Sequence, residues 1–127
     1  MTEAAFLLDS NILIYLLRGL SPDARARVEQ CHPGELVTSA IAYAEVMRKV
    51  PHDEMEQADV AALFDIVPIR PFDARAAKAY RKVPFRRGKF DRLIAAHALA
   101  LGLTLVTNNE DDFDDVQGLK IENWTNP

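Results

Sequence analysis

Short apolar segments of strand type alternate along this chain with segments of helical periodicity. Strands are predicted at 5–8, 36–38, 66–69, 103–106 and 120–122. Helices are predicted between them, at 12–17, 22–31, 39–51, 53–64, 74–82 and 91–101. Ser10 or Asn11 can cap the first of these helices. Parallel strands need a crossover connection, usually a helix, so the alternation predicts a mostly parallel central sheet with helices on both faces. The expected fold class is α/β, a three-layer α/β/α sandwich.

The composition fits one domain over residues 1–127. The chain is 127 residues long and 49% hydrophobic, enough to build a core of its own. It has no run near the ~20 apolar residues that span a bilayer and no signal-peptide pattern, so a cytoplasmic protein without membrane contact is expected. The single cysteine, Cys31, excludes an internal disulfide, and the scattered histidines do not complete a zinc cluster.

Three carboxylates stand in apolar surroundings. Asp9 follows an apolar strand segment, Glu45 lies within an apolar helical stretch, and Asp91 begins another. An ionised group in such a place loses hydration, which is tolerated mainly when a partner charge compensates. Each acid also has an ordinary explanation. Asp9 and Asp91 could cap helices, and Glu45 could pair with Lys49 at the i,i+4 spacing.

The acids become more informative if they converge. The carboxyl ends of parallel strands share one edge of a sheet, where ligands gather, and both Asp9 and the 107–112 segment follow strands. Two carboxylates ~4 Å apart repel by roughly 4 kcal/mol at an effective dielectric of about 20. A cation would remove that repulsion. A ligand set made only of oxygens favours Mg²⁺, with Mn²⁺ as a substitute.

Charged residues are clustered in the second half of the chain. Nine lysines and arginines lie from Arg70 to Arg92, and acids dominate 110–115. The formal net charge of −4 argues against indiscriminate binding of polyanions, but a local basic stripe suits phosphate contacts. A solvated helix face or loop is the more ordinary explanation of either cluster alone.

Several segments carry a resemblance to a known family. They are 7–13, 39–46, 89–99 and 105–109 with Phe113. In this order they resemble PIN-domain ribonucleases, and the end of the chain at 118–124 resembles the VapC toxin branch. The resemblance implies a Mg²⁺-dependent endoribonuclease toxin of a VapBC-type toxin–antitoxin system. It also implies a homodimer, a cognate VapB-type antitoxin, and an RNA substrate that is expected to be tRNA, with messenger RNA as the other option.

The resemblance assigns roles by position. Asp9, Glu45 and Asp91 match the family's first three acids. For the fourth acid, Asp112 is favoured over Asn109, which falls where many relatives have an aspartate. Polar groups that support the acids are then expected at Asn11, Thr107 and Asn109. Flanking phosphates are expected to contact Arg86, Arg87, Lys89 and Arg92.

The expected reaction is hydrolysis of a phosphodiester bond by a metal-activated water. Asp9 and Asp91 would hold the ion, while Glu45 and Asp112 would complete the site through water or a second ion. Glu45 would also orient or deprotonate the attacking water. Such hydrolysis does not use the ribose 2′-hydroxyl and should leave 5′-phosphate ends.

Two other functions fit parts of the sequence. A receiver-like phosphoacceptor signalling domain has a similar length, but it needs paired acids after the first strand, where Asp9 stands alone. A non-catalytic RNA-binding module would keep the fold and use the basic stripe without cleavage. His97 is expected to be a hydrogen-bonded, partly buried histidine rather than a general base, and Cys31 to be structural.

Overall fold

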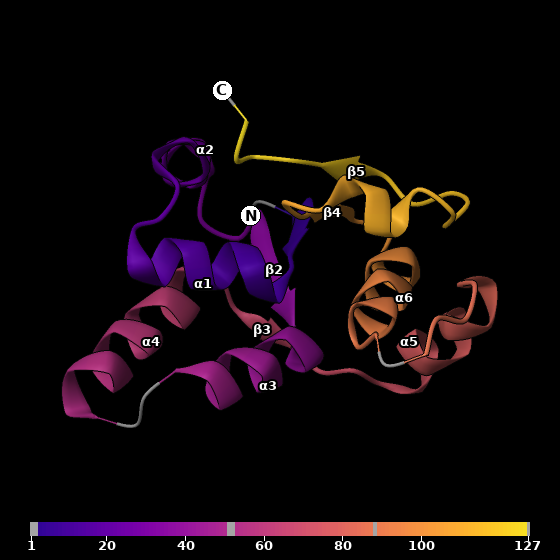
Figure 1. Ribbon diagram of the computed structural model, residues 1–127, viewed down its shortest axis with the longest axis horizontal. Coiled ribbons are helices and arrows are strands. Elements are labelled where there is room, and N and C mark those ends of the chain that lie inside the picture. Colours follow the sequence, from indigo (N-terminus) through magenta and orange to yellow (C-terminus); the bar gives the residue numbers. More distant parts are fainter. Residues whose placement is uncertain (1–2, 51–52, 88, 127) are drawn as a thin grey trace.

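The centre of the molecule is a five-stranded sheet with the order β3-β2-β1-β4-β5 (Figure 1). The computed structural model describes residues 3–50, 53–87 and 89–126. Its strands are β1 (Phe6–Leu8), β2 (Leu36–Ser39), β3 (Ile69–Arg70), β4 (Thr104–Val106) and β5 (Ile121–Glu122). All four pairs of neighbouring strands are parallel, and β1 lies in the middle between β2 and β4.

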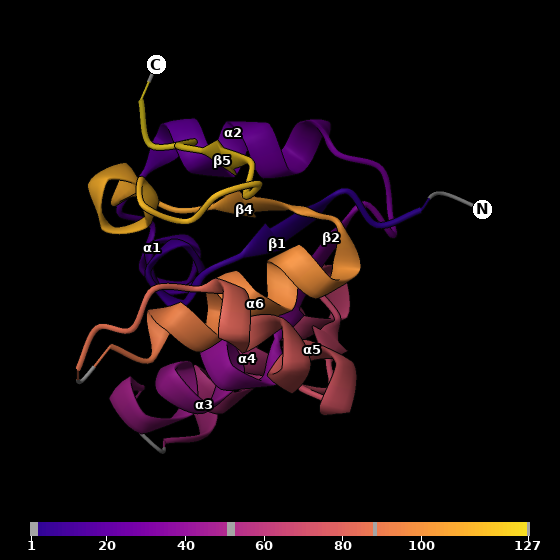
Figure 2. The ribbon, with the colours of Figure 1, turned by 90° about the vertical axis from the view of Figure 1, so that its right-hand side faces the viewer.

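Helices cover both faces of this sheet. They are α1 (Ser10–Arg18), α2 (Pro22–Gln30), α3 (Ala40–Lys49), α4 (Glu54–Ile66), α5 (Ala74–Ala79) and α6 (Asp91–Leu101), with the 3₁₀ helices η1 (Tyr80–Lys82) and η2 (Glu110–Phe113). Helices α1 and α2 lie on one side of the sheet, and α5 and α6 lie on the other (Figures 1 and 2). The predicted three-layer α/β/α sandwich is confirmed. Within the described ranges, no helix has the length and apolar character needed to cross a membrane.

The order of the strands creates a crevice at one edge of the sheet. The chain passes from β1 through β2 to β3 on one side of β1, and then returns to place β4 and β5 on its other side. Asp9 follows the carboxyl end of β1, and its backbone N–H donates to Val106 O at the end of β4. In open α/β sheets, ligands bind at such a change of direction. The fold therefore places its natural binding crevice beside Asp9.

Side-chain caps explain where several helices begin. Asp9 accepts a hydrogen bond from Ile12 N and caps α1, so Asp9, rather than Ser10 or Asn11, is the cap. Ser21 caps α2 just before Pro22, a residue suited to the first helical turn. Ser39 caps α3 by accepting from Ile41 N. Gly102 ends α6 in the left-handed conformation, with φ of 69°, which glycine adopts without strain.

The main differences from the predicted elements lie between residues 64 and 82 and in the acidic loop. Helix α4 continues to Ile66, and the predicted strand at 66–69 is reduced to Ile69–Arg70. Val67 N still bonds to Leu63 O, so helical hydrogen bonding extends into that apolar run. The helix predicted at 74–82 ends as the 3₁₀ turn η1, and the acidic loop contains the 3₁₀ helix η2. Apolar periodicity does not separate a short strand from the end of a buried helix.

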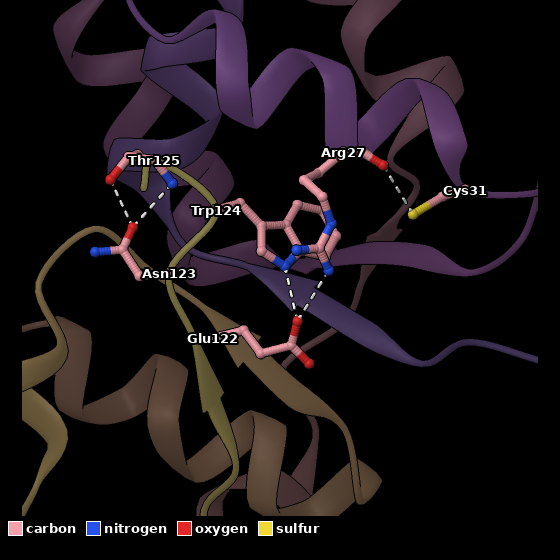
Figure 3. A network of polar contacts seen from close by, with 6 residues as sticks. All are labelled: Arg27, Cys31, Glu122, Asn123, Trp124 and Thr125. Carbon is pink, nitrogen blue, oxygen red and sulfur yellow. Dashed lines mark hydrogen bonds and ion pairs between the residues drawn. The ribbon is translucent and has the colours of Figure 1, made fainter. Parts of the chain in front are cut away.

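The C-terminal segment is fixed against α2 by a polar network (Figure 3). Glu122 Oε1 accepts from Arg27 Nη2 at 3.2 Å and from Trp124 Nε1 at 2.9 Å. The Arg27 guanidinium lies 4.9 Å from the centre of the Trp124 ring, a cation–π contact. Trp124 itself is fully buried and meets Phe6 edge to face. The tail after β5 is therefore part of the core.

Candidate active site

A polar cavity of about 290 Å³ opens at the carboxyl ends of the central strands. Its lining comes from the start of α1, from α3, from the start of α6, and from the segment after β4. The acids that line it are Asp9, Glu45, Asp91 and Asp112. The structure thus brings all four acids of the sequence prediction to one cavity, and each acid comes from a different element.

Asp9 is the most buried of these acids, with 5% of its surface exposed. Its carboxylate accepts from Ile12 N at 3.0 Å and is hydrogen-bonded to the Thr107 side chain. The pKa of Asp9 is raised to about 6, chiefly by burial and also by the charges of Glu45 and Asp91, against the lowering effect of the two hydrogen bonds. The ionised form of Asp9 is therefore destabilised by lost hydration and by its two acidic neighbours.

Glu45 lies on α3 and is half-buried. Burial raises the pKa of Glu45, and the charge of Asp91 adds to this effect, while Lys49 and a hydrogen bond with Ser10 lower it. Its Oε1 atom is buried and has no hydrogen-bond partner in the described part of the chain. Lys49, at the i+4 position, thus acts on Glu45 through its charge, and one carboxylate oxygen of Glu45 stays without a described partner.

Asp91 is the first residue of α6, and it does not act as the helix cap. Position 90 precedes the helix without a side-chain cap. Burial is the main cause that raises the pKa of Asp91, and the charge of Asp112 raises it further. Lys89 and Arg92 lower it. Asp91 Oδ1 is also buried without a described partner. A buried, unpartnered carboxylate oxygen is unusual and calls for a cation or an ordered water.

The segment after β4 supplies the polar groups around Asp112. Asn109 Nδ2 donates to Asp112 Oδ2 at 2.6 Å, so the amide supports the acid rather than replacing it. The buried Thr107 hydroxyl accepts from Asn109 N and also contacts the Asp9 carboxylate. Asn11 lines the cavity from α1, and its Nδ2 lies 3.5 Å from Asn108 Oδ1. These contacts tie the ends of β1 and β4 together beneath the cavity.

One predicted RNA-binding residue is wrong. Arg92 is 1% exposed, and its guanidinium donates to Asp115 Oδ1 at 2.9 Å and to the Asp112 carbonyl at 2.7 Å. It cannot reach a phosphate at the surface, because its donors face these internal acceptors. Arg86 is partly engaged as well, at 3.1 Å from Asp115 Oδ2. Lys89 lines the cavity, and Arg87 is exposed.

His97 joins two of the acid-bearing helices. Its Nδ1 lies 2.8 Å from the Ser39 hydroxyl, which also caps α3 by accepting from Ile41 N. Burial lowers the pKa of His97 and favours the neutral ring, which can accept the Ser39 proton at Nδ1. The expected hydrogen bond of His97 is present, but the ring is almost fully buried, at 1% exposure, where partial burial was expected. Its effect is to fix the start of α3, which carries Glu45, against α6, which carries Asp91.

Two cavity residues receive no catalytic or binding role from the sequence. Ser10 is predicted only as a helix cap, but its side chain bonds to Glu45. Lys49 is predicted only as a partner for Glu45, but it also lines the cavity, to which it brings a basic side chain from α3. The i,i+4 spacing from Glu45 is the signal that could place Lys49 there. Nothing local in the sequence distinguishes Ser10 from an ordinary cap.

The donors around the cavity suit a hard divalent cation better than zinc. In the part of the chain that the structure describes, no group of three or more histidine, cysteine, aspartate or glutamate side chains is arranged to hold a metal ion. Mg²⁺, however, is commonly held by one or two carboxylates, with water and substrate phosphate as its other ligands. The unpartnered oxygens of Glu45 and Asp91 and the buried carboxylate of Asp9 fit that kind of binding.

The chain is similar to known proteins over most of its length. The family model of the PIN domain matches residues 6–119. The tRNA(fMet)-specific endonuclease VapC of Shigella flexneri is 30% identical over 130 residues, covering 94% of this chain and 98% of the relative. Ribonuclease VapC2 of Haemophilus influenzae is 29% identical, covering 94% of this chain and 97% of the relative.

The fold is also similar to that of chains in solved VapBC structures. The crystal structure of VapBC2 from Rickettsia felis bound to a promoter DNA fragment contains a chain with a TM-score of 0.82 and 27% identity, covering 94% of this chain and 98% of that one. VapBC-1 from nontypeable Haemophilus influenzae contains a chain with a TM-score of 0.76 and 28% identity, covering 95% and 98%. In both cases the similarity extends over almost the full length of this chain and of the chain in the solved structure.

Proposed function

Because the chain belongs to the PIN-domain family, and to its VapC ribonucleases, we propose that it is a Mg²⁺-dependent endoribonuclease and the toxin of a VapBC-type toxin–antitoxin system. One observation carries the proposal. Asp9, Glu45, Asp91 and Asp112 come from four separate elements and line one cavity at the carboxyl ends of the strands. Unpartnered carboxylate oxygens at Glu45 and Asp91 leave that cavity suited to a cation.

We assign the metal-holding role to Asp9 and Asp91, with Glu45 and Asp112 completing the site through water or a second ion. Mg²⁺, or Mn²⁺ in its place, would supply a Lewis acid that activates water and draws charge from the phosphate. Burial is the main cause of the raised pKa of Asp9, about 6, and the charges of Glu45 and Asp91 add to it, so a cation beside this carboxylate would stabilise its ionised form. Asn109, Thr107 and Asn11 keep the acids in place through the hydrogen bonds described above.

The remaining cavity residues bind and orient the substrate. Glu45 accepts a proton from the attacking water or aligns it. Lys49 and Lys89 line the cavity and hold the phosphate next to the acids, and Arg87 and Arg86 contact the flanking phosphates. No step needs the ribose 2′-hydroxyl as a nucleophile, so the expected products carry 5′-phosphate and 3′-hydroxyl ends.

We propose tRNA as the substrate class, because relatives from Shigella flexneri and Salmonella typhimurium are named tRNA(fMet)-specific endonucleases. Messenger RNA is the second candidate. The proposed partner is a VapB-type antitoxin, since the similar structures from Rickettsia felis and Salmonella typhimurium are VapBC complexes. We further propose a homodimer, to be tested by light scattering. An RNA-cleaving toxin would act in the cytoplasm, where its substrates are.

The test is cleavage of total tRNA by the purified chain in Mg²⁺, with and without EDTA. Asp9→Asn and Asp91→Asn should each lower the rate by at least about a hundredfold without loss of fold. Asp53→Asn is the matched control, because Asp53 is an exposed cap of α4 and asparagine caps helices equally well. It should cleave like the wild type.

The outcomes separate the alternatives. Cleavage that persists in EDTA, or in Asp9→Asn, would refute the assignment of the acids. Binding of tRNA without cleavage in Mg²⁺ would favour the non-catalytic RNA-binding module. Incorporation of phosphate from acetyl phosphate into the wild type would favour the receiver-like alternative.

A further inference from the structure

A second groove lies at the other end of α6, away from the cavity. Its volume is about 690 Å³, and it is formed by α5, η1, the C-terminal half of α6 and the turn at Gln117 and Gly118. Its basic residues are Arg75, Lys78, Arg81 and Lys82. Leu99 and Ala100 of α6 contribute an apolar floor. Unlike the acidic cavity, this groove has no carboxylate among the described residues that line it.

The periodicity of α5 and η1 explains this arrangement. The four basic residues fall at i, i+3, i+6 and i+7, so they share one face of a continuous helical segment. Ala76 on another face is buried, and α5 packs closely along α6. All four cations are exposed, and the ion pairs found among the described residues use other arginines. The basic face is thus not needed to hold the fold together.

The groove and the catalytic cavity are joined by two segments of the chain. Helix α6 runs from Asp91, in the cavity, to Ala100, in the groove. Nine residues of α-helix correspond to about 14 Å. After η1, residues 83–87 run toward the start of α6 (Figure 2). They include Arg86 and Arg87, and Lys89 lies just before α6. Cations therefore follow one side of the molecule from the groove to the acids.

We infer that this groove, which we call the α5 groove, is a second RNA-binding surface that holds the sugar–phosphate backbone of the substrate away from the cleaved bond. The inference rests on the proposed function. A polyanion fits because these cations have no ion pair among the described residues and line a groove. Further basic residues lie between that groove and the site where a phosphate must react. Along the axis of a B-form duplex, the phosphates of one strand are spaced by about 3.4 Å, so about 14 Å of duplex corresponds to roughly four base pairs. Contacts with phosphates would not depend on base sequence.

The test compares RNAs of two lengths. A stem-loop that extends at least eight base pairs from the cleaved bond would reach the α5 groove, and a fragment with two nucleotides on each side would not. In Lys78→Gln/Lys82→Gln, we expect the KM for the long RNA to rise about tenfold with kcat unchanged. The slope of the logarithm of the binding constant against the logarithm of the salt concentration should become less steep by about 1 to 2. Cleavage of the short RNA should not change.

Two controls isolate the role of charge at this position. Arg18→Gln/Arg25→Gln removes two exposed cations from α1 and α2, on the other side of the sheet, and should behave like the wild type (Figure 1). Lys78→Arg/Lys82→Arg keeps the charges and should also keep the low KM. An equal KM for the long RNA in the glutamine variant and the wild type would overturn the inference.

Binding assays separate this inference from the proposed function. Fluorescence anisotropy with the long RNA is measured in the Asp9→Asn background, where no cleavage is expected. If the wild type cleaves no RNA but Lys78→Gln/Lys82→Gln still weakens binding of the long RNA, the nuclease proposal fails and the α5 groove stands. If the glutamine variant loses affinity only for a copurified acidic antitoxin and not for RNA, the groove takes an acidic protein segment and the inference fails.

Discussion

Asp9 illustrates how much the sequence around a single residue can predict. Its position after an apolar strand predicts a carboxylate that is poorly hydrated. In the structure 5% of its surface is exposed and its pKa is raised to about 6. Arg92 is the opposite case. It belongs to a run of basic residues, but it is buried because Asp115, 23 positions later, lies beside it. Partners so far apart in sequence leave no local signal.

The burial of Asp9 predicts how stability depends on pH in metal-free protein. The pKa of Asp9 is about 6 in the folded state against 3.8 for the free side chain, so the folded state binds the proton more strongly. Stability from this group is complete below about pH 4 and is lost as the pH rises through about 6, a loss of about 3 kcal/mol. Asp9→Asn should therefore be more stable than the wild type at pH 8 in EDTA.

Urea unfolding of both proteins from pH 4 to pH 8 checks this prediction. The difference between them should shrink to near zero at pH 4, because Asp9 is then protonated in the folded state and gains no penalty from its burial. His97 acts in the opposite direction, since burial lowers its pKa and protonation at low pH favours unfolding. Its effect is common to both proteins and cancels in the difference. A difference that does not vary with pH would show that Asp9 is ionised without penalty.

At the level of elements, the sequence predicts types well and partners poorly. Strands β1, β2 and β4 fall where their apolar segments predict them, and α6 has the predicted bounds. The strand order could not be predicted, because it depends on which face each crossover takes. The candidate site was predictable as a set of acids. The hydrogen bonds that hold these acids in place, such as the one between Ser39 and His97, could not be predicted, because they join residues far apart in the chain.

The contact between α6 and η2 can be tested with two arginines that share one acceptor. Arg92 and Arg86 both donate to Asp115, but Arg92 is buried and also holds the Asp112 carbonyl. Arg92→Gln should lower the free energy of unfolding by about 2 to 3 kcal/mol, because buried hydrogen bonds to a charged group are lost. It should also lower the cleavage rate about tenfold by displacing Asp112. Arg86→Gln should change stability only slightly, as exposed ion pairs do.

Denaturant titrations and initial cleavage rates, measured for both variants, decide this point. If Arg92→Gln is destabilised but cleaves at the wild-type rate when folded, Arg92 supports the fold without positioning Asp112. If the two variants behave alike, the buried position of Arg92 has no energetic consequence.

For the whole molecule, the C-terminal segment decides whether the chain unfolds as one unit. The family match ends at residue 119, but β5 and the buried Trp124 follow it. Trp124 contacts Phe6 of β1 and Arg27 of α2, so the end of the chain packs against its beginning. A structure tied together in this way should unfold in one cooperative transition, as small single domains usually do.

Trp124 is the chain's one tryptophan and so reports on this tail directly. Unfolding followed by its fluorescence and by far-UV circular dichroism should give the same midpoint, which would support a single domain over residues 1–127. Trp124→Ala should cost about 3 to 5 kcal/mol, because it removes a large buried side chain. Asn126→Ala, an exposed change in the same tail, should cost almost nothing. A fluorescence transition that precedes the loss of helix would mean that the tail unfolds on its own, and the core would then end before β5.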